Sequence, residues 1–196
     1  MVASELLIIP GTPAVVGELA PAFAPARGIV AAARQAAGRH VRAAIVGSHD
    51  ERWRTDHTGT FAAWGAAHVD VGGGNYLPEL VARYVLGSES LIAESRSAIG
   101  ALDPEVLTVV VLDGPAGLTP RAPLAMIPEA PAVHTQLQEF LAGRRALGLS
   151  SDELRTAGVD EPALWLELAE FIPARAELIV TEDSLGVGGY VAKWEV

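Results

Sequence analysis

The sequence predicts an α/β fold, a single domain whose central, mostly parallel sheet is flanked by helices. Short apolar runs alternate along the chain with longer amphipathic runs, the order expected when strands alternate with helices. The run TVVVL is rich in β-branched residues and almost entirely apolar, which is typical of a strand covered on both faces. A chain of 196 residues, 50% of them hydrophobic, is long enough for one buried core and short for two. We therefore expect residues 1–196 to form one domain.

The expected strands are short apolar runs bounded by glycine, proline or polar residues. In chain order they are Leu6–Ile9, Ala43–Val46, His68–Val71, Thr108–Leu112, Leu178–Thr181 and Gly189–Trp194. We expect the fourth of these, TVVVL, in the interior of the sheet, because a strand at the edge would not need two apolar faces.

The expected helices repeat apolar residues at the three- and four-residue spacing of one helical face. They are Gly28–Arg39, Leu77–Leu86, Glu129–Ala142 and two shorter segments, 150–158 and 160–173. Ser150 and Glu153 have the spacing of a capping box. Asp160 is expected to cap the last helix, whose first turn tolerates Pro162. Residues 114–131 hold five prolines and are expected to form a long loop over the sheet.

The charge balance argues against two classes of partner. The chain carries 24 acidic against 14 basic residues, a net charge of −10, and Lys193 is its only lysine. Nucleic acids and anionic membranes are bound through clusters of positive charge, which the sequence lacks. We expect neither as a partner, whereas a small-molecule ligand stays open.

The composition also restricts the chemistry and the compartment. Without cysteine the chain has no disulfide, zinc–thiolate site, iron–sulfur cluster or catalytic thiol, and a cytoplasmic location is unopposed. The N-terminal run MVASELLIIPGTP has no basic residue and meets Pro10 early, so we expect neither a signal peptide nor an anchor. No run approaches the roughly 18 apolar residues of a membrane span. We expect a soluble, cytoplasmic protein.

Four loops that follow expected strands hold the candidate site residues, because ligands of α/β folds bind beyond the carboxyl ends of strands. These loops are PGTP (10–13), GSHDERWRTDH (47–57), GGGN (72–75) and DGPAGLTPRAP (113–123). The second loop holds two imidazoles and two carboxylates: His49, Asp50, Asp56 and His57. They could ligate a divalent metal or form an ordinary polar loop. Asp113, at the end of the TVVVL strand, is either a ligand or catalytic carboxylate or a residue that satisfies the following turn.

The glycine run Gly72–Gly74 lies between an expected strand and an expected helix. Such a run could let backbone amides approach a phosphate at the helix N-terminus. It matches neither the dinucleotide-binding fingerprint nor the Walker pattern, and no lysine is near it. We interpret it as a tight turn, with a phosphate- or nucleotide-binding module as an alternative.

Four segments together carry a resemblance to a known family. LLIIPGTPAVVGELA, AIVGSHDER, VVVLDGPAGLTPRAP and DSLGVGGYVAKW follow one another as opening, second, central and C-terminal strands with their loops. In this order they resemble the class III extradiol ring-cleavage dioxygenases of the subunit-B-like group, and within it a short, alanine-rich actinobacterial branch. The resemblance spans nearly the whole chain. It implies an α/β sandwich with a mixed central sheet and, because many relatives are dimers, allows a homo-oligomer.

The resemblance also implies an iron site that is incomplete in this chain. Active members hold Fe(II) with two histidines and a carboxylate, and another histidine acts as acid–base catalyst. Gly11 stands where the first ligand histidine belongs, and Leu118 or Thr119 where the acid–base histidine belongs. Only His49 occupies the place of a ligand histidine. No catalytic residue is assigned, and the site is expected to be degenerate.

The leading interpretation is therefore an extradiol-dioxygenase-like protein, without a cofactor, whose cleft binds a small molecule without ring cleavage. The cleft is expected between five residues of the strand-following loops: Gly11, Thr12, Ser48, Gly114 and Thr119. The alternative is a metal-dependent oxidoreductase with Fe(II) or Zn(II) in a rebuilt site. Its candidate ligands are His49, Asp50, His57 and Asp113. A purely structural His49 is expected to hydrogen-bond to a neighbouring carboxylate or backbone group of the same loop, with Asp50 the nearest choice in the sequence.

Overall fold

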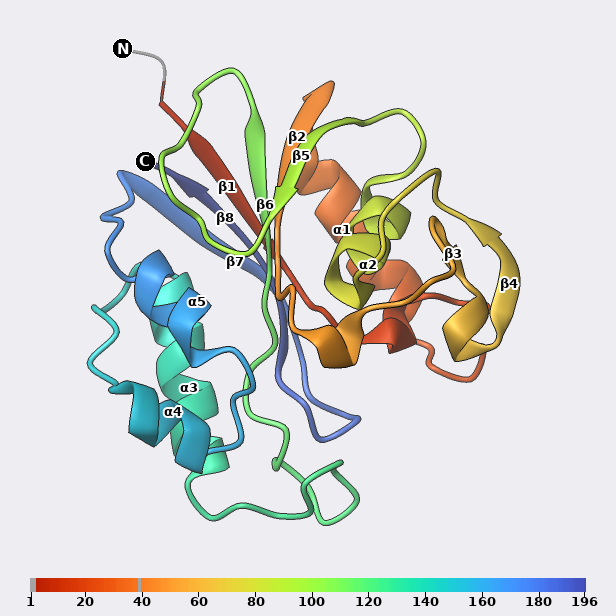
Figure 1. Ribbon diagram of the computed structural model, residues 1–196. Coiled ribbons are helices and arrows are strands. Elements are labelled where there is room, and N and C mark those ends of the chain that lie inside the picture. Colours follow the sequence, from red (N-terminus) through yellow and green to blue (C-terminus); the bar gives the residue numbers. More distant parts are fainter. Residues whose placement is uncertain (1–2, 39) are drawn as a thin grey trace.

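A mixed sheet of six strands forms the centre of the molecule (Figure 1). The structure is a computed structural model and describes residues 3–38 and 40–196. The strands are β1 (Glu5–Ile9), β2 (Arg42–Val46), β5 (Leu91–Arg96), β6 (Leu107–Val111), β7 (Arg175–Glu182) and β8 (Gly189–Glu195). Their order across the sheet is β5-β2-β6-β1-β8-β7. The first four strands in this order pair in parallel, and β8 runs antiparallel to both of its neighbours.

Helices cover both faces of the sheet (Figure 1). On one side lie α1 (Ala26–Ala37) and α2 (Leu77–Leu86), and on the other α3 (Ala130–Leu141), α4 (Ser151–Thr156) and α5 (Pro162–Leu168). Strand β1 contributes side chains to the cores on both faces of the sheet. Leu7 and Ile9 pack in the core with α1 and α2, whereas Leu6 and Ile8 pack in the core with α3, α4 and α5. Successive residues of a strand point to opposite faces, so a continuous apolar run fills two cores.

A small subdomain lies outside this sheet, beside α2 (Figure 1). It contains the two-stranded sheet of β3 (Thr60–Phe61) and β4 (Ala66–Asp70) and the 3₁₀ turns η2 (Glu51–Trp53) and η3 (Ala62–Trp64). A third such turn, η1 (Pro13–Val15), follows β1. Phe61 is completely buried and packs edge-on against Tyr84 of α2, which anchors the subdomain to the main core.

The predicted α/β architecture is confirmed, and β6 is an interior strand with all five residues buried. Every expected helix and strand is present, with bounds that shift by a few residues. Arg39, the expected end of the first helix, lies outside the described residues. The sequence prediction missed β5, an edge strand whose residues are exposed or half-buried, and the two-residue strand β3.

Two local predictions at helix starts had different outcomes. The capping box is confirmed, since Ser150 Oγ accepts from the Glu153 N–H and the Glu153 carboxylate accepts from the Ser150 N–H. The cap on α5 is wrong. Glu161 occupies that position without a side-chain cap bond, and Asp160 instead accepts a hydrogen bond from the guanidinium of Arg52.

The proline-rich segment 114–129 lies beyond the carboxyl edge of the parallel strands, not over a face of the sheet as predicted (Figure 1). Backbone bonds hold it there. The Ala116 N–H donates to Gly158 before α5, and the Leu118 N–H donates to Gly186 in the β7–β8 hairpin. Hydrogen bonds to segments outside the sheet therefore position this loop beyond the ends of the strands.

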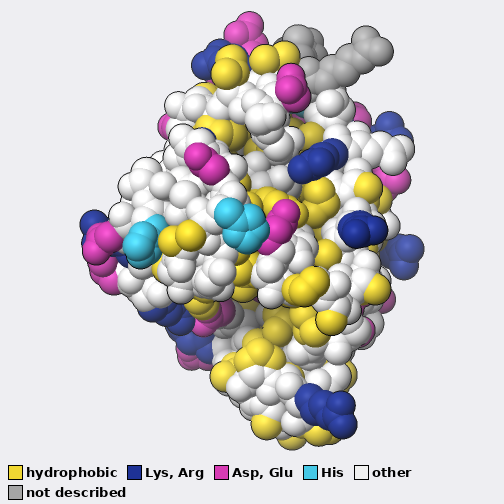
Figure 2. Space-filling model, turned by 90° about the vertical axis from the view of Figure 1, so that its right-hand side faces the viewer, with side chains coloured by type: hydrophobic (Ala, Val, Ile, Leu, Met, Phe, Trp, Pro, Cys, Tyr) yellow, Lys and Arg dark blue, Asp and Glu magenta, His cyan; other side chains and the backbone are white. Residues whose placement is uncertain are grey.

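The described helices include none with the length and apolarity needed to cross a membrane. Figure 2 shows the face on the β3–β4 side, where acidic and basic side chains are both scattered. Hydrophobic side chains gather toward its lower end, the end where segment 114–129 lies (Figures 1 and 2).

Candidate functional site

A cavity of about 380 Å³ opens where β1, β2 and β6 end. We call it the Asp113 cavity. Its walls come from the loops that follow these three strands, from the start of α2, from the proline-rich segment and from the α4–α5 loop. The lining residues are Gly11, Thr12, Pro13, Ser48, Trp53, Leu77, Pro78, Val111, Asp113, Gly114, Ala116, Pro123, Leu124, Gly158, Asp160, Glu161 and Val187. Most of these are apolar or glycine, and none is basic.

Asp113 is held through both its side chain and its backbone. Its Oδ1 accepts a hydrogen bond from the Gly11 N–H at 2.9 Å, and its own carbonyl oxygen accepts from the indole N–H of Trp165 at 3.0 Å. Burial raises the pKa of its carboxyl from 3.8 to about 6, the N–H groups of Gly11 and Thr12 oppose this rise, and the charge of Asp160 adds to it. The carboxyl can therefore take up or release a proton close to neutral pH.

Two glycines let the backbone pass close to polar side chains. A Cβ at Gly11 would lie 3.0 Å from Oδ2 of Asp113 and 3.2 Å from the side chain of Val111. A Cβ at Gly114 would lie 2.3 Å from the hydroxyl of Tyr190. The glycines in PGTP and DGPAG are thus explained by close packing around Asp113 and Tyr190.

Behind Gly114 lies a buried pair, Tyr190 and His134. A hydrogen bond of 2.6 Å joins the Tyr190 hydroxyl to Nδ1 of His134, and Nε2 of the same ring lies 2.7 Å from Nε2 of Gln138. Burial lowers the pKa of His134, although nearby Asp183 opposes this. Burial also raises the pKa of Tyr190 well above its ordinary value, and Asp113 and Asp183 add to the rise. The pair is therefore a neutral support beneath the cavity loop at pH 7.

Arg52 bridges two loops at the cavity mouth. Its guanidinium lies 3.0 Å from Asp160 and 3.2 Å from Glu161, both on the α4–α5 loop, and 3.7 Å from Asp50 on its own loop. It also stacks over Trp53, 5.0 Å from the ring centre. Asp160 and Glu161 thus meet a cation at the mouth, whereas Asp113 lies deeper.

The structure brings five of the residues singled out in the sequence to this one cavity: Gly11, Thr12, Ser48, Asp113 and Gly114. Thr119 does not line the cavity. It lies beside Gly186 of the β7–β8 hairpin, where an added Cβ would stand 2.7 Å from the Thr119 hydroxyl.

The candidate metal ligands of the loop 47–57, His49, Asp50 and His57, do not line the cavity. The His49 ring stacks on Tyr76 at 4.4 Å, and its Nε2 makes a long 3.4 Å contact with Ser95 Oγ. The expected bond to Asp50 is wrong, because Asp50 caps η2 by accepting from the Arg52 N–H. His57 is exposed.

These positions do not fit an iron site of the two-histidine, one-carboxylate type. The lining of the cavity offers carboxylates and no imidazole, and Gly11 has no side chain. Across residues 3–38 and 40–196, no group of three or more histidine, aspartate or glutamate side chains is arranged to hold a metal ion.

The glycine run has a packing explanation. Gly72 and Gly74 have positive φ angles of 78° and 97°, which glycine adopts without strain. A Cβ on Gly74 would stand 2.8 Å from the carboxyl carbon of Glu79, and Glu79 binds Arg83 at 2.9 Å. Glu79 places a negative charge in the first turn of α2, and the neighbouring cation, Arg83, is already paired with it. The glycine run is therefore poorly suited to bind a phosphate group.

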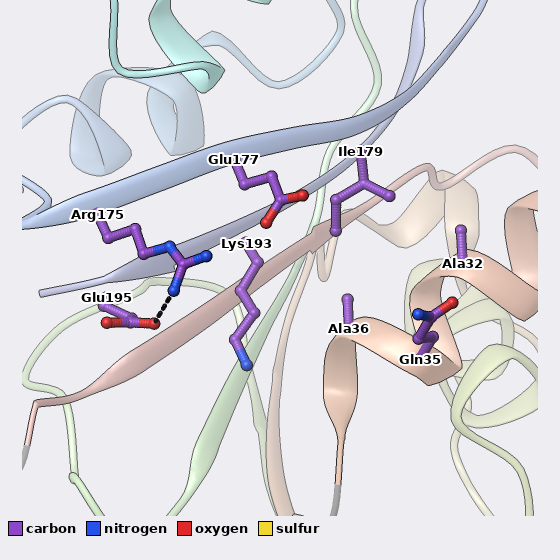
Figure 3. Close-up of a pocket in the computed structure, with 8 residues that line it drawn as sticks. All are labelled: Ala32, Gln35, Ala36, Arg175, Glu177, Ile179, Lys193 and Glu195. Carbon is purple, nitrogen blue, oxygen red and sulfur yellow. Dashed lines mark ion pairs between the residues drawn. The ribbon is translucent and has the colours of Figure 1, made fainter.

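A second hollow of about 300 Å³ lies between α1 and the β7–β8 strands (Figure 3). Three of its four charged side chains, those of Arg175, Lys193 and Glu195, form ion pairs. Arg175 pairs with Glu195 at 3.8 Å, and Lys193 pairs with Glu5 at 2.8 Å. Hydrogen bonds from Lys193 and His40 outweigh burial and lower the pKa of Glu5. We regard this hollow as a sheet edge stabilised by ion pairs.

Sequence reasoning missed part of the cavity. The sequence predicts a helix cap at Asp160, and it holds no recognisable signal at Trp53 or Glu161. Val187 lies in the turn between the last two expected strands. It reaches the cavity because the β7–β8 hairpin folds beside the loop after β6, where the Gly114 N–H donates to Gly188.

The chain matches no protein-family model and no curated protein.

Proposed function

We propose that this chain is a class III extradiol dioxygenase-like protein that binds a small molecule in the Asp113 cavity and does not cleave aromatic rings. The observation that carries the proposal is the cavity itself, which lies beyond the carboxyl ends of three parallel strands. Ligands of α/β proteins bind at this edge of the sheet. A volume of about 380 Å³ is within the range of small-molecule pockets, and a mostly apolar lining with a few polar groups is their usual composition.

Ring cleavage is left out of the proposal because of the donor set. Extradiol chemistry needs a metal with open positions for both catechol oxygens and for O₂, and it needs a base near the substrate. Asp113 could serve as a base, but the cavity supplies no imidazole to complete a ligand set. His49, the one retained histidine of the resemblance, is engaged with Tyr76 instead.

Binding can be tested by protein-observed NMR with a set of small aromatic and aliphatic fragments. We expect shifts to cluster on residues that line the cavity. Ala116→Phe, which places a ring in the cavity, should abolish them. Ala63→Phe, on the exposed turn η3, is the matched control and should leave them unchanged. Fragments that bind the Ala116→Phe variant as well as the wild type would contradict the proposal.

The absence of ring cleavage can be tested on the same protein. Purified protein supplied with Fe(II), O₂ and simple catechols should form no yellow semialdehyde above background. Robust product formation would favour the metal-dependent oxidoreductase. So would stoichiometric iron or zinc in the wild type that is lost in His49→Ala.

A further inference from the structure

The polar lining of the Asp113 cavity is predominantly anionic. Three carboxylates contribute to it, from Asp113, Asp160 and Glu161, and no lysine, arginine or histidine does. The oxygens of the two hydroxyl groups already accept hydrogen bonds from backbone N–H groups. Thr12 Oγ1 accepts from Ala14, and Ser48 Oγ accepts from Asp50. The charged groups of the lining therefore favour a positively charged ligand over a negatively charged one.

Asp113 differs from the other two carboxylates in its partners. Asp160 and Glu161 are each within 3.2 Å of Arg52. Asp113 receives backbone N–H groups, and no side chain in the described part of the chain donates to it. Asp113 is half-buried, and a carboxylate that has lost part of its hydration without gaining a cation is unfavourable unless something compensates it. The deepest acid of the cavity thus lacks the partner that the outer two have.

We propose that the cavity takes an amine, an apolar molecule whose single ammonium group donates to Asp113 and whose hydrocarbon body lies against Leu77, Val111 and Val187. This inference rests on the proposed function, since it names the ligand class of the same cavity. An ammonium group offers three donors and a full positive charge in a small volume. A carboxylate or phosphate ligand would instead meet three carboxylates with no cation of the lining to offset them.

The protonation of Asp113 supports this assignment. Its pKa of about 6 leaves the carboxyl mostly ionised at pH 7.5 and mostly protonated at pH 5. The other titratable groups that influence it or respond to it are Asp160 and Tyr190, neither of which supplies a positive charge. Amine binding should therefore weaken as the pH falls through 6, because protonation removes the charge that holds the ligand.

Three probes with one ring and different head groups test the proposal: benzylamine, benzyl alcohol and benzoate. Affinities are measured by NMR titration of the wild type at pH 7.5 and pH 5.0. Benzylamine should bind at least about tenfold more tightly than the alcohol at pH 7.5 and lose about tenfold at pH 5.0. The alcohol should be insensitive to pH, and benzoate should bind most weakly.

Asp113→Asn should remove the preference for benzylamine and leave the alcohol within about threefold of its wild-type affinity. Asp152→Asn, on an exposed residue of α4 outside the cavity lining, is the matched control and should keep the preference. If the Asp113 variant fails to fold, the pH series on the wild type decides alone.

The outcomes separate the two proposals. Benzyl alcohol or benzoate binding in the cavity as tightly as benzylamine would overturn the amine assignment and leave small-molecule binding intact. A benzylamine affinity that does not change between pH 7.5 and 5.0 would also overturn it. Failure of all three probes and of the fragment set to bind would overturn both.

Discussion

The N–H of Gly11 donates a hydrogen bond of 2.9 Å to Oδ1 of Asp113, a residue 102 positions further along the sequence. This bond joins the ends of two parallel strands. Gly11 follows β1 and Asp113 follows β6, and these strands are neighbours in the sheet. The bond holds the carboxyl in the lining of the cavity, and the missing side chain at position 11 leaves room for it. The shape and the charge of the cavity thus both depend on Gly11 and Asp113.

The ionisation of Asp113 should make stability depend on pH. Its pKa is higher in the folded protein than the ordinary value of 3.8, so the folded state holds the proton more tightly. The contribution of this group to the free energy of unfolding should therefore fall as the pH rises from about 4 to about 6, by at most about 3 kcal/mol. Urea unfolding of wild type and Asp113→Asn across this range measures it. A difference between the two that does not change with pH would show that Asp113 titrates normally.

Glycine at position 11 should be required for packing. In Gly11→Ala the new Cβ would crowd Asp113 and Val111, and we expect a loss of about 1–2 kcal/mol in the free energy of unfolding. Gly28→Ala is the matched control, because nothing lies within 4 Å of its Cβ position in α1. There alanine should stabilise the helix by up to about 1 kcal/mol. Equal effects at the two sites would mean that the strand ends relax around the added methyl group.

The order of helices and strands could be predicted because it depends on local patterns. A continuous apolar run such as that of β6 predicts a strand with two buried faces, and Ser150 with Glu153 predicts a helix start. Strand β5 was missed for the same reason. It is an edge strand whose pairing with β2 gives it structure, while its own residues have no apolar pattern.

The site was only partly predictable, since it depends on contacts between distant segments. The rule that loops meet at the carboxyl edge of parallel strands brought Gly11, Ser48 and Asp113 together. It could not show that Ser48 faces the cavity while adjacent His49 packs on Tyr76. Nor could it place Asp160, whose position is set by the loop between two helices on the other side of the cavity.

His49 should act through packing. His49→Ala removes the stack on Tyr76 and the contact with Ser95, and should cost about 1 kcal/mol in the free energy of unfolding. His49→Phe keeps a ring against Tyr76 and should cost less. Chemical unfolding measures both, and elemental analysis should show the same metal content in both variants and the wild type. If the phenylalanine variant is as unstable as the alanine variant, the contact with Ser95, and not the stack on Tyr76, is what stabilises the protein.

Removal of the Tyr190 hydroxyl should destabilise the support beneath the cavity. Tyr190→Phe leaves Nδ1 of buried His134 without its 2.6 Å partner, and the expected cost is about 1–3 kcal/mol. Tyr84→Phe is the comparison. The Tyr84 hydroxyl donates to exposed Glu18 and accepts a longer bond, 3.3 Å, from the half-buried Gly17 N–H, and water can replace it at both. Thermal unfolding of the two variants should show the larger loss for Tyr190→Phe. The reverse order would indicate that a water molecule satisfies His134 in the variant.

Arg52 should weaken amine binding in the wild type although it touches the cavity only at its mouth. It neutralises Asp160 and Glu161, so Arg52→Ala leaves both carboxylates free and makes the cavity more negative. Exposed ion pairs contribute about 0.2–1 kcal/mol, so stability should change little and benzylamine affinity should rise by up to about fivefold. The gain should shrink in high salt, where exposed charges are screened. Arg155→Ala removes a comparable exposed pair with Asp152 on α4 and should leave the affinity unchanged. Weaker binding of benzylamine by Arg52→Ala would mean that the ion pairs of Arg52, which join the two loops, help to hold the ligand. This effect would then outweigh the repulsion between the guanidinium and the ammonium group.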